Sequence, residues 1–357
     1  NWQSWTEWPA EWRNLPTEAF YKIFEGFESE VSYHLFLQYL CFKQFKEMKV
    51  EATDHGIFLK GDIPILISKE SADVWGEGAL FQTEYSAGAP PDMYNSEGQN
   101  WGFPLYNWDE MEKRGYSWWK KRLEVASHHY DIYRIDHIVG FYRIWRTPQN
   151  SSARYGSFVP TEQWKWLVQG EKIMRQMLSF SHLLPIGEDL GTVPPEVRQN
   201  LRSLGICGTK VMRWERMWNE DKQFIKYADY DPLSMTTVST HDSETQKQWW
   251  LNQPDEAKEF AKFKGWDYTP ILSDDKHFQI LRDSHHTASL FHINLLQEYL
   301  AQIPDMTSKL LEEERINVPG VVSNKNWSYR FLPSVEEIVA SPELRSLIGN
   351  LLTSSSR

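Results

Sequence analysis

Three acidic residues, each near the end of a short strand-like run, are the residues of this chain best suited to do chemistry. They are Asp136, Glu188 and Asp242, and each follows an apolar or β-branched run that ends next to a turn. The segments between them are long enough for crossover helices. Carboxylates delivered one per strand to the mouth of a parallel barrel are typical of enzymes that act on glycosidic bonds.

Asp136 has the surroundings expected of an ionised nucleophile. Arg134 lies two residues before it in a predicted strand, so the two side chains share a face. A neighbouring arginine favours the charged form of a carboxylate, and a glycosidic nucleophile must be ionised. A purely structural Arg–Asp ion pair would give the same pattern. His137 follows directly and is placed to donate a hydrogen bond to a sugar hydroxyl.

Glu188 has the features of a proton donor. A donor to a leaving glycosidic oxygen needs a raised pKa, which a partly apolar site and a neighbouring negative charge produce. Asp136 supplies that charge if the two strands are adjacent, although an acid at a helix N-terminus would fit this position as well. Asp189 then points to the opposite face, where a structural role is expected.

The remaining acidic candidates are Asp242 and Asp62. His241 and Asp242 repeat the pairing of Asp136 and His137 in reverse order. A third carboxylate can hold the hydroxyls of a sugar ring that is distorted toward an oxocarbenium ion. Asp62 ends another strand-like run, where a turn or capping role is the simpler interpretation.

Alternating strands and helices must position these residues. Strand-like runs are expected at 56–67, 132–138, 184–189, 208–212 and 236–240, with a last strand end at 315–320. Helical patterns separate them, which gives about six strand–helix units and predicts a parallel sheet. A complete barrel of this type needs eight such units. We therefore predict an α/β fold, a TIM-type (β/α)8 barrel whose first one or two strands are missing from this chain.

We expect three parts along the chain. Residues 1–50 form a helical segment that belongs to an inserted subdomain, residues 51–345 supply the remainder of the catalytic barrel, and residues 346–357 form a C-terminal tail. The barrel part includes a long active-site loop at 87–107. Loops of this length are typically functional or disordered, and the aromatic residues in this one argue against disorder.

Composition excludes several classes of partner. The 357 residues carry a net charge of -11, which argues against nucleic acid as a partner. No apolar run is long enough to span a membrane. Two distant cysteines, Cys41 and Cys207, favour a reducing compartment, so we expect a cytoplasmic location. The chain opens on Asn1 rather than Met, so we expect the native start to lie upstream.

Neither a metal nor an organic cofactor is expected. No His and Cys residues have metal-ligand spacing, and no dinucleotide-binding, phosphate-binding or serine-hydrolase motif occurs. Aromatic residues make up 15% of the chain. Aromatic rings stack on sugar rings, but packing in the core explains most of them equally well.

Taken together and in order, the motifs resemble one family, the 4-α-glucanotransferases, also called amylomaltases or disproportionating enzymes, which are relatives of the α-amylases. The matching runs are 61–65, 71–75, 88–92, 98–102 with Pro104, 134–137, 188–191, 240–242, and 317–320 with Asn326 and Trp327. They cover the chain from about residue 30 to 335. The run 98–108 looks especially like the branch that includes the plant cytosolic form.

The resemblance implies a function and a role for each site residue. It implies retaining transfer of α-1,4-glucan segments between malto-oligosaccharides, with Asp136 as nucleophile, Glu188 as acid/base and Asp242 as transition-state stabiliser. The substrate-binding residues that it implies are Arg134, His137, His241, Trp101, Asp62, Asp92, Tyr94 and Asn317. The loop at 90–96 is expected to arch over the cleft and help exclude water, so that a sugar intercepts the intermediate.

Some positions depart from the family pattern. Met93 and Tyr94 stand where members often carry Tyr and Phe, Ser243 replaces a usual Asn, and Gly187 replaces a usual Ala. In the family an N-terminal part carries the first barrel strands, and we expect that part to be missing from this chain. Two other functions stay open: an α-glucan hydrolase of the same clan, and an inactive, truncated glucan-binding remnant. The oligomeric state is also open.

Overall fold

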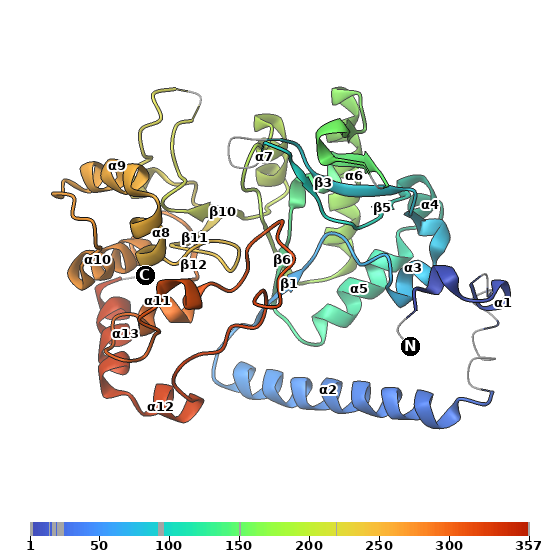
Figure 1. Cartoon of the computed structure of the whole chain (residues 1–357), viewed down its shortest axis with the longest axis horizontal. Coiled ribbons are helices and arrows are strands. Elements are labelled where there is room, and N and C mark those ends of the chain that lie inside the picture. The colour runs from blue at the N-terminus through green and yellow to red at the C-terminus, as the bar shows by residue number, and fades with distance from the viewer. Residues whose placement is uncertain are drawn as a thin grey trace. The chain divides into compact units, whose positions relative to one another are not determined.

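The computed structural model describes residues 3–13, 15, 19, 25–91, 96–149, 151–218 and 220–355 (Figure 1). The chain divides into two compact units, Asn1–Ile206 and Cys207–Arg357. Each unit has its own parallel sheet and its own hydrophobic core, and each is described by itself. No helix in the described ranges is both long enough and apolar enough to cross a membrane.

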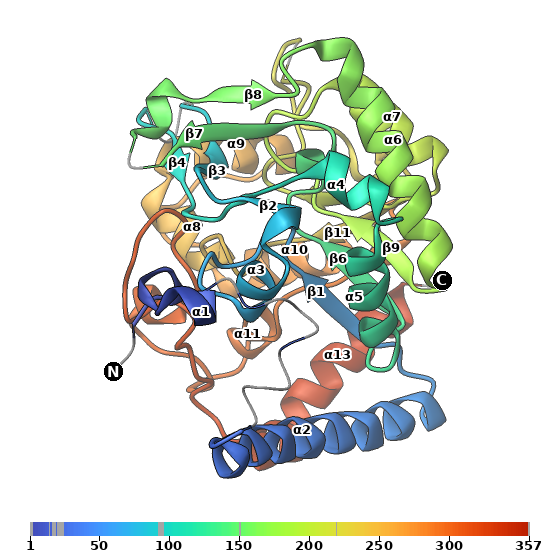
Figure 2. The same cartoon turned by 90° about the vertical axis from the view of Figure 1, so that its right-hand side faces the viewer.

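The first unit is built on a three-stranded parallel sheet in the order β1-β6-β9. The strands are β1 (Lys60–Ile63), β6 (Ile132–Ile135) and β9 (Leu184–Gly187). The helices α5 (Ser117–Ser127), α6 (Gln163–Phe180) and α7 (Pro195–Ser203) pack against one another in sequence order (Figure 2). The prediction of parallel strands followed by helices is confirmed here.

The register of this sheet explains which side chains meet. Asp62 pairs with Arg134, and Arg134 pairs with Ile186 on the other side. The next pair along β6 and β9 is Ile135 with Gly187. Asp136 directly follows Ile135, and Glu188 directly follows Gly187. Because carboxyl ends of parallel strands meet at one edge of a sheet, the acidic residues of all three runs are brought to the same edge.

A second, antiparallel sheet in this unit was not predicted. Its order is β4-β3-β7-β8, and β2 pairs separately with β5. The bounds are β2 (Phe81–Gln82), β3 (Tyr85–Ala89), β4 (Gln99–Asn100), β5 (Leu105–Tyr106), β7 (Ile144–Pro148) and β8 (Ser157–Val159). Most of these strands are too short to show an alternating pattern in the sequence.

The segment 87–107, expected as a long loop, is therefore partly sheet. Gly88 of β3 pairs with Asn100 of β4, and a Cβ at Gly88 would lie 1.9 Å from the carbonyl oxygen of Gln99. Only glycine allows this close approach of the two strands. Residues 92–95, which include the predicted substrate-binding residues Asp92 and Tyr94, lie outside the described residues.

The described residues that precede β1 are mostly helical. Three helices precede β1 in the described ranges: η1 (Trp5–Glu7), α1 (Ala10–Arg13) and α2 (Glu28–Asp54). The shorter helices that follow β1 in the first unit are α3 (Ala72–Gly76), η3 (Gly78–Leu80), α4 (Trp108–Lys113), η4 (Ile138–Phe141) and η5 (Ala153–Tyr155). The long helix α2 has no buried residue and leaves Tyr33, Phe36 and Tyr39 more than half exposed. Lys49 of α2 forms an ion pair with Asp131, directly before β6.

The second unit is built on the parallel sheet β10-β11-β12. Its strands are β10 (Gly208–Val211), β11 (Ser234–Thr237) and β12 (Phe291–His292). Its helices are η6 (Tyr227–Asp229), α8 (Gln246–Asn252), α9 (Pro254–Lys264), α10 (Asp274–His285), α11 (Leu296–Leu300), η7 (Leu311–Glu314), α12 (Val335–Ala340) and α13 (Pro342–Ser354). Residues 346–354, expected as part of a tail, lie in α13.

The strand end predicted at 315–320 is wrong. Residues 315–318 have no regular structure, and the strand beside β11 is instead β12. The predicted segment is held by side chains, because the amide group of Asn326 bonds to the backbone of Val318. The sequence misled because β12 spans only two residues and carries no strand pattern, whereas Ile316 and Val318 do.

Candidate active site

The first group of site residues lies at the carboxyl ends of β1, β6 and β9. Nη1 of Arg134 donates to both carboxylate oxygens of Asp62, at 2.8 and 3.0 Å, and lies 2.8 Å from Oδ1 of Asp136. The Arg134 side chain is 11% exposed, whereas those of Asp62 and Asp136 are 46% and 38% exposed. Both carboxylates are thus open to a ligand while a nearly buried cation fixes their positions.

Arg134 is a permanent positive charge in this group. Burial disfavours its charged form, but the surrounding carboxyl groups, with Asp136 the strongest, raise the pKa of Arg134 above its ordinary value. The ion pair that the sequence predicts between Arg134 and Asp136 is therefore present. Asp62, for which a turn or capping role is the simpler sequence interpretation, instead joins the same cluster through Arg134.

Glu188 follows β9 directly, and its backbone continues the ladder with β6. Its N–H donates to the carbonyl oxygen of Ile135 at 2.9 Å, and its own carbonyl accepts from the N–H of Ile138 at 3.1 Å. Its carboxyl oxygens accept from the N–H groups of His137 and Leu190, at 2.9 and 2.8 Å. Backbone donors therefore hold both oxygens of this side chain in place.

The protonation of Glu188 differs from that of an ordinary glutamate. Burial raises the pKa of Glu188 to about 7, and the negative charge of Asp136 also raises it, against the opposing effects of Arg134 and the two backbone donors. A carboxyl that retains its proton near neutral pH has the form that a general acid needs. The sequence predicted a raised pKa for Glu188, caused by an apolar site and by the charge of Asp136. Burial and Asp136 are the two causes that raise the pKa in the structure.

His137 forms the turn between Asp136 and the helix η4. Its φ of 44° lies in the left-handed region, which is uncommon for residues other than glycine, and this turn directs its N–H to Glu188. Burial, and then the charge of Arg143, lowers the pKa of His137 to about 4, so its imidazole is neutral near pH 7. The rings of Trp101 and His137 pack in a T-shaped arrangement, with their centroids 5.0 Å apart.

One member of this group was not anticipated from the sequence. Lys60 lies two residues before Asp62 on β1, so the two side chains share a face of the sheet. Lys60 pairs with Ile132 of β6. Burial, and then the charge of Arg134, lowers the pKa of Lys60. The spacing of Lys60 and Asp62 matches that of Arg134 and Asp136 and was the available signal.

The second group of site residues lies in the unit Cys207–Arg357, after β11. Oδ1 of Asp242 accepts from the side-chain amide of Asn317 at 2.6 Å, and Oδ2 lies 3.2 Å from Nε2 of His241. The backbone N–H of Asn317 donates to the carbonyl oxygen of His241 at 3.1 Å. The Asp242 side chain is 37% exposed, so this carboxylate is also open to a ligand.

Two further residues complete this group. Arg315, which the sequence reasoning missed, donates from Nη2 to the carbonyl oxygen of Asp242 at 3.1 Å and from Nε to that of Asn317 at 2.9 Å. Its position two residues before Asn317 was the available signal. Trp327 lies with its ring 5.2 Å from that of His241 and is 66% exposed, which leaves an aromatic face free to stack on a ligand.

The predicted residues thus fall into two described clusters. The first brings together Asp62, Trp101, Arg134, Asp136, His137 and Glu188, and the second brings together His241, Asp242 and Asn317. Within the described ranges, no group of three or more His, Cys, Asp or Glu residues has the arrangement of a metal site.

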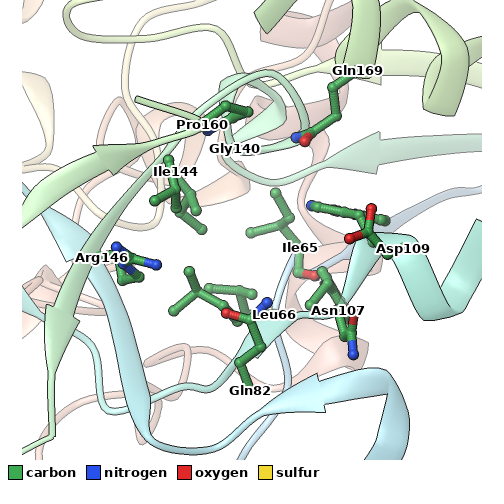
Figure 3. Close-up of a pocket in the computed structure, with 14 residues that line it drawn as sticks. Ile65, Leu66, Gln82, Asn107, Asp109, Gly140, Ile144, Arg146, Pro160 and Gln169 are labelled. Atoms are coloured by element: carbon green, nitrogen blue, oxygen red, sulfur yellow. Dashed lines mark hydrogen bonds between the residues drawn. The ribbon is translucent and has the colours of Figure 1, made fainter. Parts of the chain in front are cut away.

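A separate pocket of 180 Å³ lies in the first unit, between residues that follow β1 and β6 and residues of the antiparallel strands (Figure 3). Ile65, Leu66 and Ile144 form an apolar part of its wall, and Arg146 and Asp109 contribute charged groups. None of the predicted site residues lines it. The candidate site residues therefore lie in the two side-chain clusters, one in each unit, and not at this pocket.

A carboxylate paired with arginine, next to a carboxyl with a raised pKa at the end of the neighbouring parallel strand, is typical of enzymes that cleave or transfer glycosidic bonds. Comparison with known proteins identifies the family. The glycoside hydrolase family 77 model, described as 4-alpha-glucanotransferase, matches residues 1–335. The chain belongs to this family.

Individual relatives agree with this assignment. A 4-alpha-glucanotransferase of Chlamydia pneumoniae is 50% identical over 336 residues, which cover 94% of this chain and 63% of the relative. One from Thermus thermophilus is 30% identical over 92% of this chain and 65% of its own length. The chain thus spans less than two thirds of each of these two relatives.

Solved structures show the same fold. The amylomaltase from Streptococcus agalactiae in complex with acarbose superposes with a TM-score of 0.80 at 25% identity, over 99% of this chain and 69% of that one. The amylomaltase from Corynebacterium glutamicum gives a TM-score of 0.71 over 90% of this chain and 50% of that one. At 22% identity the second likeness concerns the fold alone.

Proposed function

We propose that this chain acts as a 4-α-glucanotransferase. It transfers α-1,4-glucan segments from a donor malto-oligosaccharide to the 4-OH of an acceptor glucan or glucose, with retention of configuration and without a metal or organic cofactor. The observation that carries the proposal is the placement of Asp136 and Glu188 at the ends of adjacent parallel strands, with Arg134 paired to Asp136. Family membership supports the same activity.

The reaction takes two displacements at the anomeric carbon. In the first, Glu188 gives its proton to the leaving glycosidic oxygen while a carboxylate oxygen of Asp136 attacks C1 and forms a glycosyl–enzyme ester. In the second, the Glu188 carboxylate removes the proton from the acceptor 4-OH, which attacks C1 and releases Asp136. Asp242 holds ring hydroxyls of the sugar at C1 as it distorts in both transition states.

The sheet geometry supports retention. Neighbouring strands in a parallel sheet lie about 4.8 Å apart, and Asp136 and Glu188 are the residues that directly follow the paired Ile135 and Gly187 on the two strands. Retaining enzymes have carboxyl groups about 5–5.5 Å apart, whereas inverting enzymes need about 6.5–9.5 Å to admit a water molecule. Adjacent strands suit the shorter spacing.

The proposal extends to the fold and the substrate contacts. We assign the described parallel strands to a (β/α)8 barrel that lacks its first one or two strands in this chain, with residues 51–345 as its catalytic part and 1–50 as part of an inserted subdomain. Arg134, His137, His241, Trp101, Asp62, Asp92, Tyr94 and Asn317 bind the sugar. A cytoplasmic location is proposed as well, supported by the free thiols of Cys41 and Cys207.

Maltotriose distinguishes the proposed activity from its alternatives. We expect incubation with the purified chain to give glucose together with maltotetraose and longer oligomers, because an acceptor sugar intercepts the intermediate. Chromatographic separation of the products over time checks this. Glucose and maltose without longer products would instead identify a hydrolase, and the absence of turnover would favour a glucan-binding remnant, which isothermal titration with maltoheptaose would then detect.

The rate should depend on pH through Glu188. An acid catalyst acts only while protonated, so kcat/KM for maltotriose should fall tenfold per pH unit above the pKa of Glu188, with the midpoint of this decline at about 7. An α-maltosyl fluoride donor is the control, because fluoride leaves without a proton. Its kcat/KM should lack this high-pH decline; an identical decline for both donors would contradict the assignment of Glu188.

A further inference from the structure

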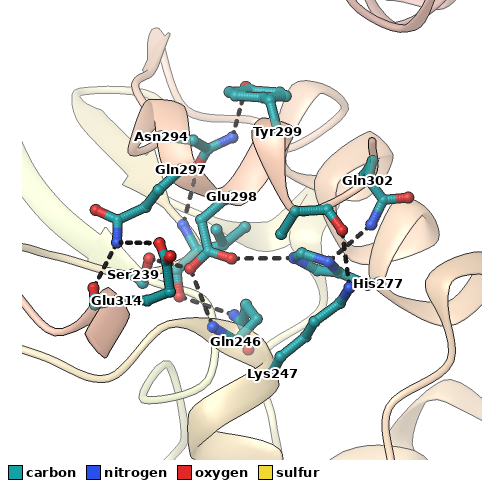
Figure 4. A network of polar contacts seen from close by, with 12 residues as sticks. Ser239, Gln246, Lys247, His277, Asn294, Gln297, Glu298, Tyr299, Gln302 and Glu314 are labelled. Carbon is teal, nitrogen blue, oxygen red and sulfur yellow. Dashed lines mark hydrogen bonds and ion pairs between the residues drawn. The ribbon is translucent and has the colours of Figure 1, made fainter. Parts of the chain in front are cut away.

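A buried polar network in the second unit lies directly behind the segment that carries His241 and Asp242. At its centre is Glu298 of the short helix α11, and this residue is only 1% exposed (Figure 4). Neither His277 nor Gln302, which continue the network from other elements, is among the residues expected at the active site. A buried carboxylate is costly unless it is fully hydrogen-bonded, so its contacts indicate what it holds in place.

Glu298 holds both ends of the segment 239–246. Its Oε1 accepts from the hydroxyl of Ser239 and, at 3.0 Å, from the backbone N–H of Gln246. Ser239 and Gln246 are 1% and 0% exposed. His241 and Asp242 lie between these two contacts, so the carboxylate bridges the base of the loop that presents them.

The other oxygen of Glu298 is anchored to the body of the unit. Nε2 of His277 lies 3.0 Å from Oε2, and Nδ1 of His277 lies 2.7 Å from the side-chain amide of Gln302. His277 is fully buried in α10. Although burial disfavours the charge, the contacts with His277, Ser239 and the N–H of Gln246 hold the pKa of Glu298 below its ordinary value, so it is a carboxylate.

The preceding residue, Gln297, fixes the start of the segment whose Arg315 and Asn317 donate hydrogen bonds to Asp242. Its side-chain amide donates to the carbonyl oxygen of Glu314 at 2.5 Å. The side chain of Glu314 is itself fixed by the N–H of Ser308 at 2.7 Å and the hydroxyl of Tyr329 at 2.8 Å. Arg315 follows Glu314 directly, and with Asn317 it donates to Asp242.

We propose that Gln297 and Glu298 together are positioning residues for Asp242. Glu298 fixes the loop that carries this carboxylate, and Gln297 fixes the irregular segment after η7, whose Arg315 and Asn317 donate to Asp242. Two adjacent residues of α11 thereby fix both the loop that carries Asp242 and the segment that donates hydrogen bonds to it. The inference rests on the proposed function, because positioning matters to the rate only if Asp242 acts on the transition state.

Glu298→Gln is the informative variant because it keeps the shape of the side chain. An amide group cannot accept from both the Gln246 N–H and His277, so one contact is lost and the base of the loop loosens. We expect kcat for transfer from maltotriose to fall by about 100-fold, with KM changed less than kcat. Glu256→Gln is the matched control, because this carboxylate bonds Trp249 in the same unit but does not contact the loop.

A double-mutant cycle separates positioning from a general structural effect. If Glu298 acts through Asp242, adding Glu298→Gln to Asp242→Asn should lower the residual kcat no further. Equal multiplicative losses in both backgrounds would overturn the proposal, as would a folded Glu298→Gln variant with the kcat of the unsubstituted protein. If Glu298→Gln does not fold, Ser239→Ala, which removes one donor and leaves the carboxylate, takes its place in the cycle.

A readout independent of turnover distinguishes failure of this inference from failure of the proposed function. In native-state hydrogen exchange, the amides of residues 239–246 should exchange roughly tenfold faster in Glu298→Gln, while those of α9 stay unchanged. Unchanged exchange would overturn the positioning role whether or not the chain transfers glucan. Faster exchange in a chain without transferase activity would support the positioning role and reject only the proposed function.

Discussion

Replacing Asp136 by alanine should reduce kcat for transfer from maltotriose by about 10⁴-fold or more, because it removes the group that we propose as the nucleophile. Folding should be retained. The Asp136 side chain is 38% exposed, and Arg134 keeps its contacts with Asp62 after the substitution. Initial rates of glucose release, compared with the thermal unfolding midpoint of the same sample, measure both expectations.

The same variant allows a direct test of the nucleophilic role. Alanine leaves space beside C1, so azide can enter and displace fluoride from α-maltosyl fluoride in a single step. A single displacement inverts the anomeric centre, and the product should be β-maltosyl azide, identified by its C1 proton coupling in NMR spectra. Retained α-maltosyl azide from Asp136→Ala would assign the nucleophilic role to another residue. Asp189→Ala is a control, since the Asp189 side chain is buried and paired with Arg198.

The sequence was sufficient to predict the parallel part of the fold. β6 and β9 are short runs, apolar except for Arg134 in β6, and each is followed directly by an acidic residue. This local pattern predicts the strands, and the helical segments between them predict parallel pairing. The antiparallel strands β4 and β5 could not be predicted, because two-residue strands owe their existence to partners elsewhere in the chain. Gly88 was the one local indication, since close strand approach requires glycine there.

The candidate site followed the same division. Arg134 and Asp136 are two residues apart on one strand, so local periodicity alone places them on one face. Asn317 reaches Asp242 from 75 residues further along the chain, and no local pattern predicts that contact. Asn317 lies in a motif that the chain shares with the family, and the resemblance therefore indicated it. Arg315 and Lys60 lie outside the shared motifs. Tertiary contacts, rather than residue type, identify these two.

Replacing Glu188 by alanine should have the second largest effect, and the size of the loss should depend on the leaving group. A positioned general acid contributes about 10²–10⁴-fold to rate, so maltotriose, whose leaving oxygen needs a proton, should lose that much in kcat/KM. α-Maltosyl fluoride should lose far less in the first displacement. Rapid-quench measurement of the first turnover with each donor gives the two losses separately.

The second displacement provides the contrast with Asp136. If Glu188 is the base that we propose, the acceptor is not activated without it. The glycosyl–enzyme ester on Asp136 should then accumulate and be visible as a mass increase of one maltosyl group in intact-protein mass spectrometry. Azide needs no base, so it should restore turnover and give α-maltosyl azide, the product of two inversions. The two alanine variants therefore predict azides of opposite configuration from one donor. If both gave the same anomer, the division of roles between Asp136 and Glu188 would be wrong, even if each variant had lost its transferase activity.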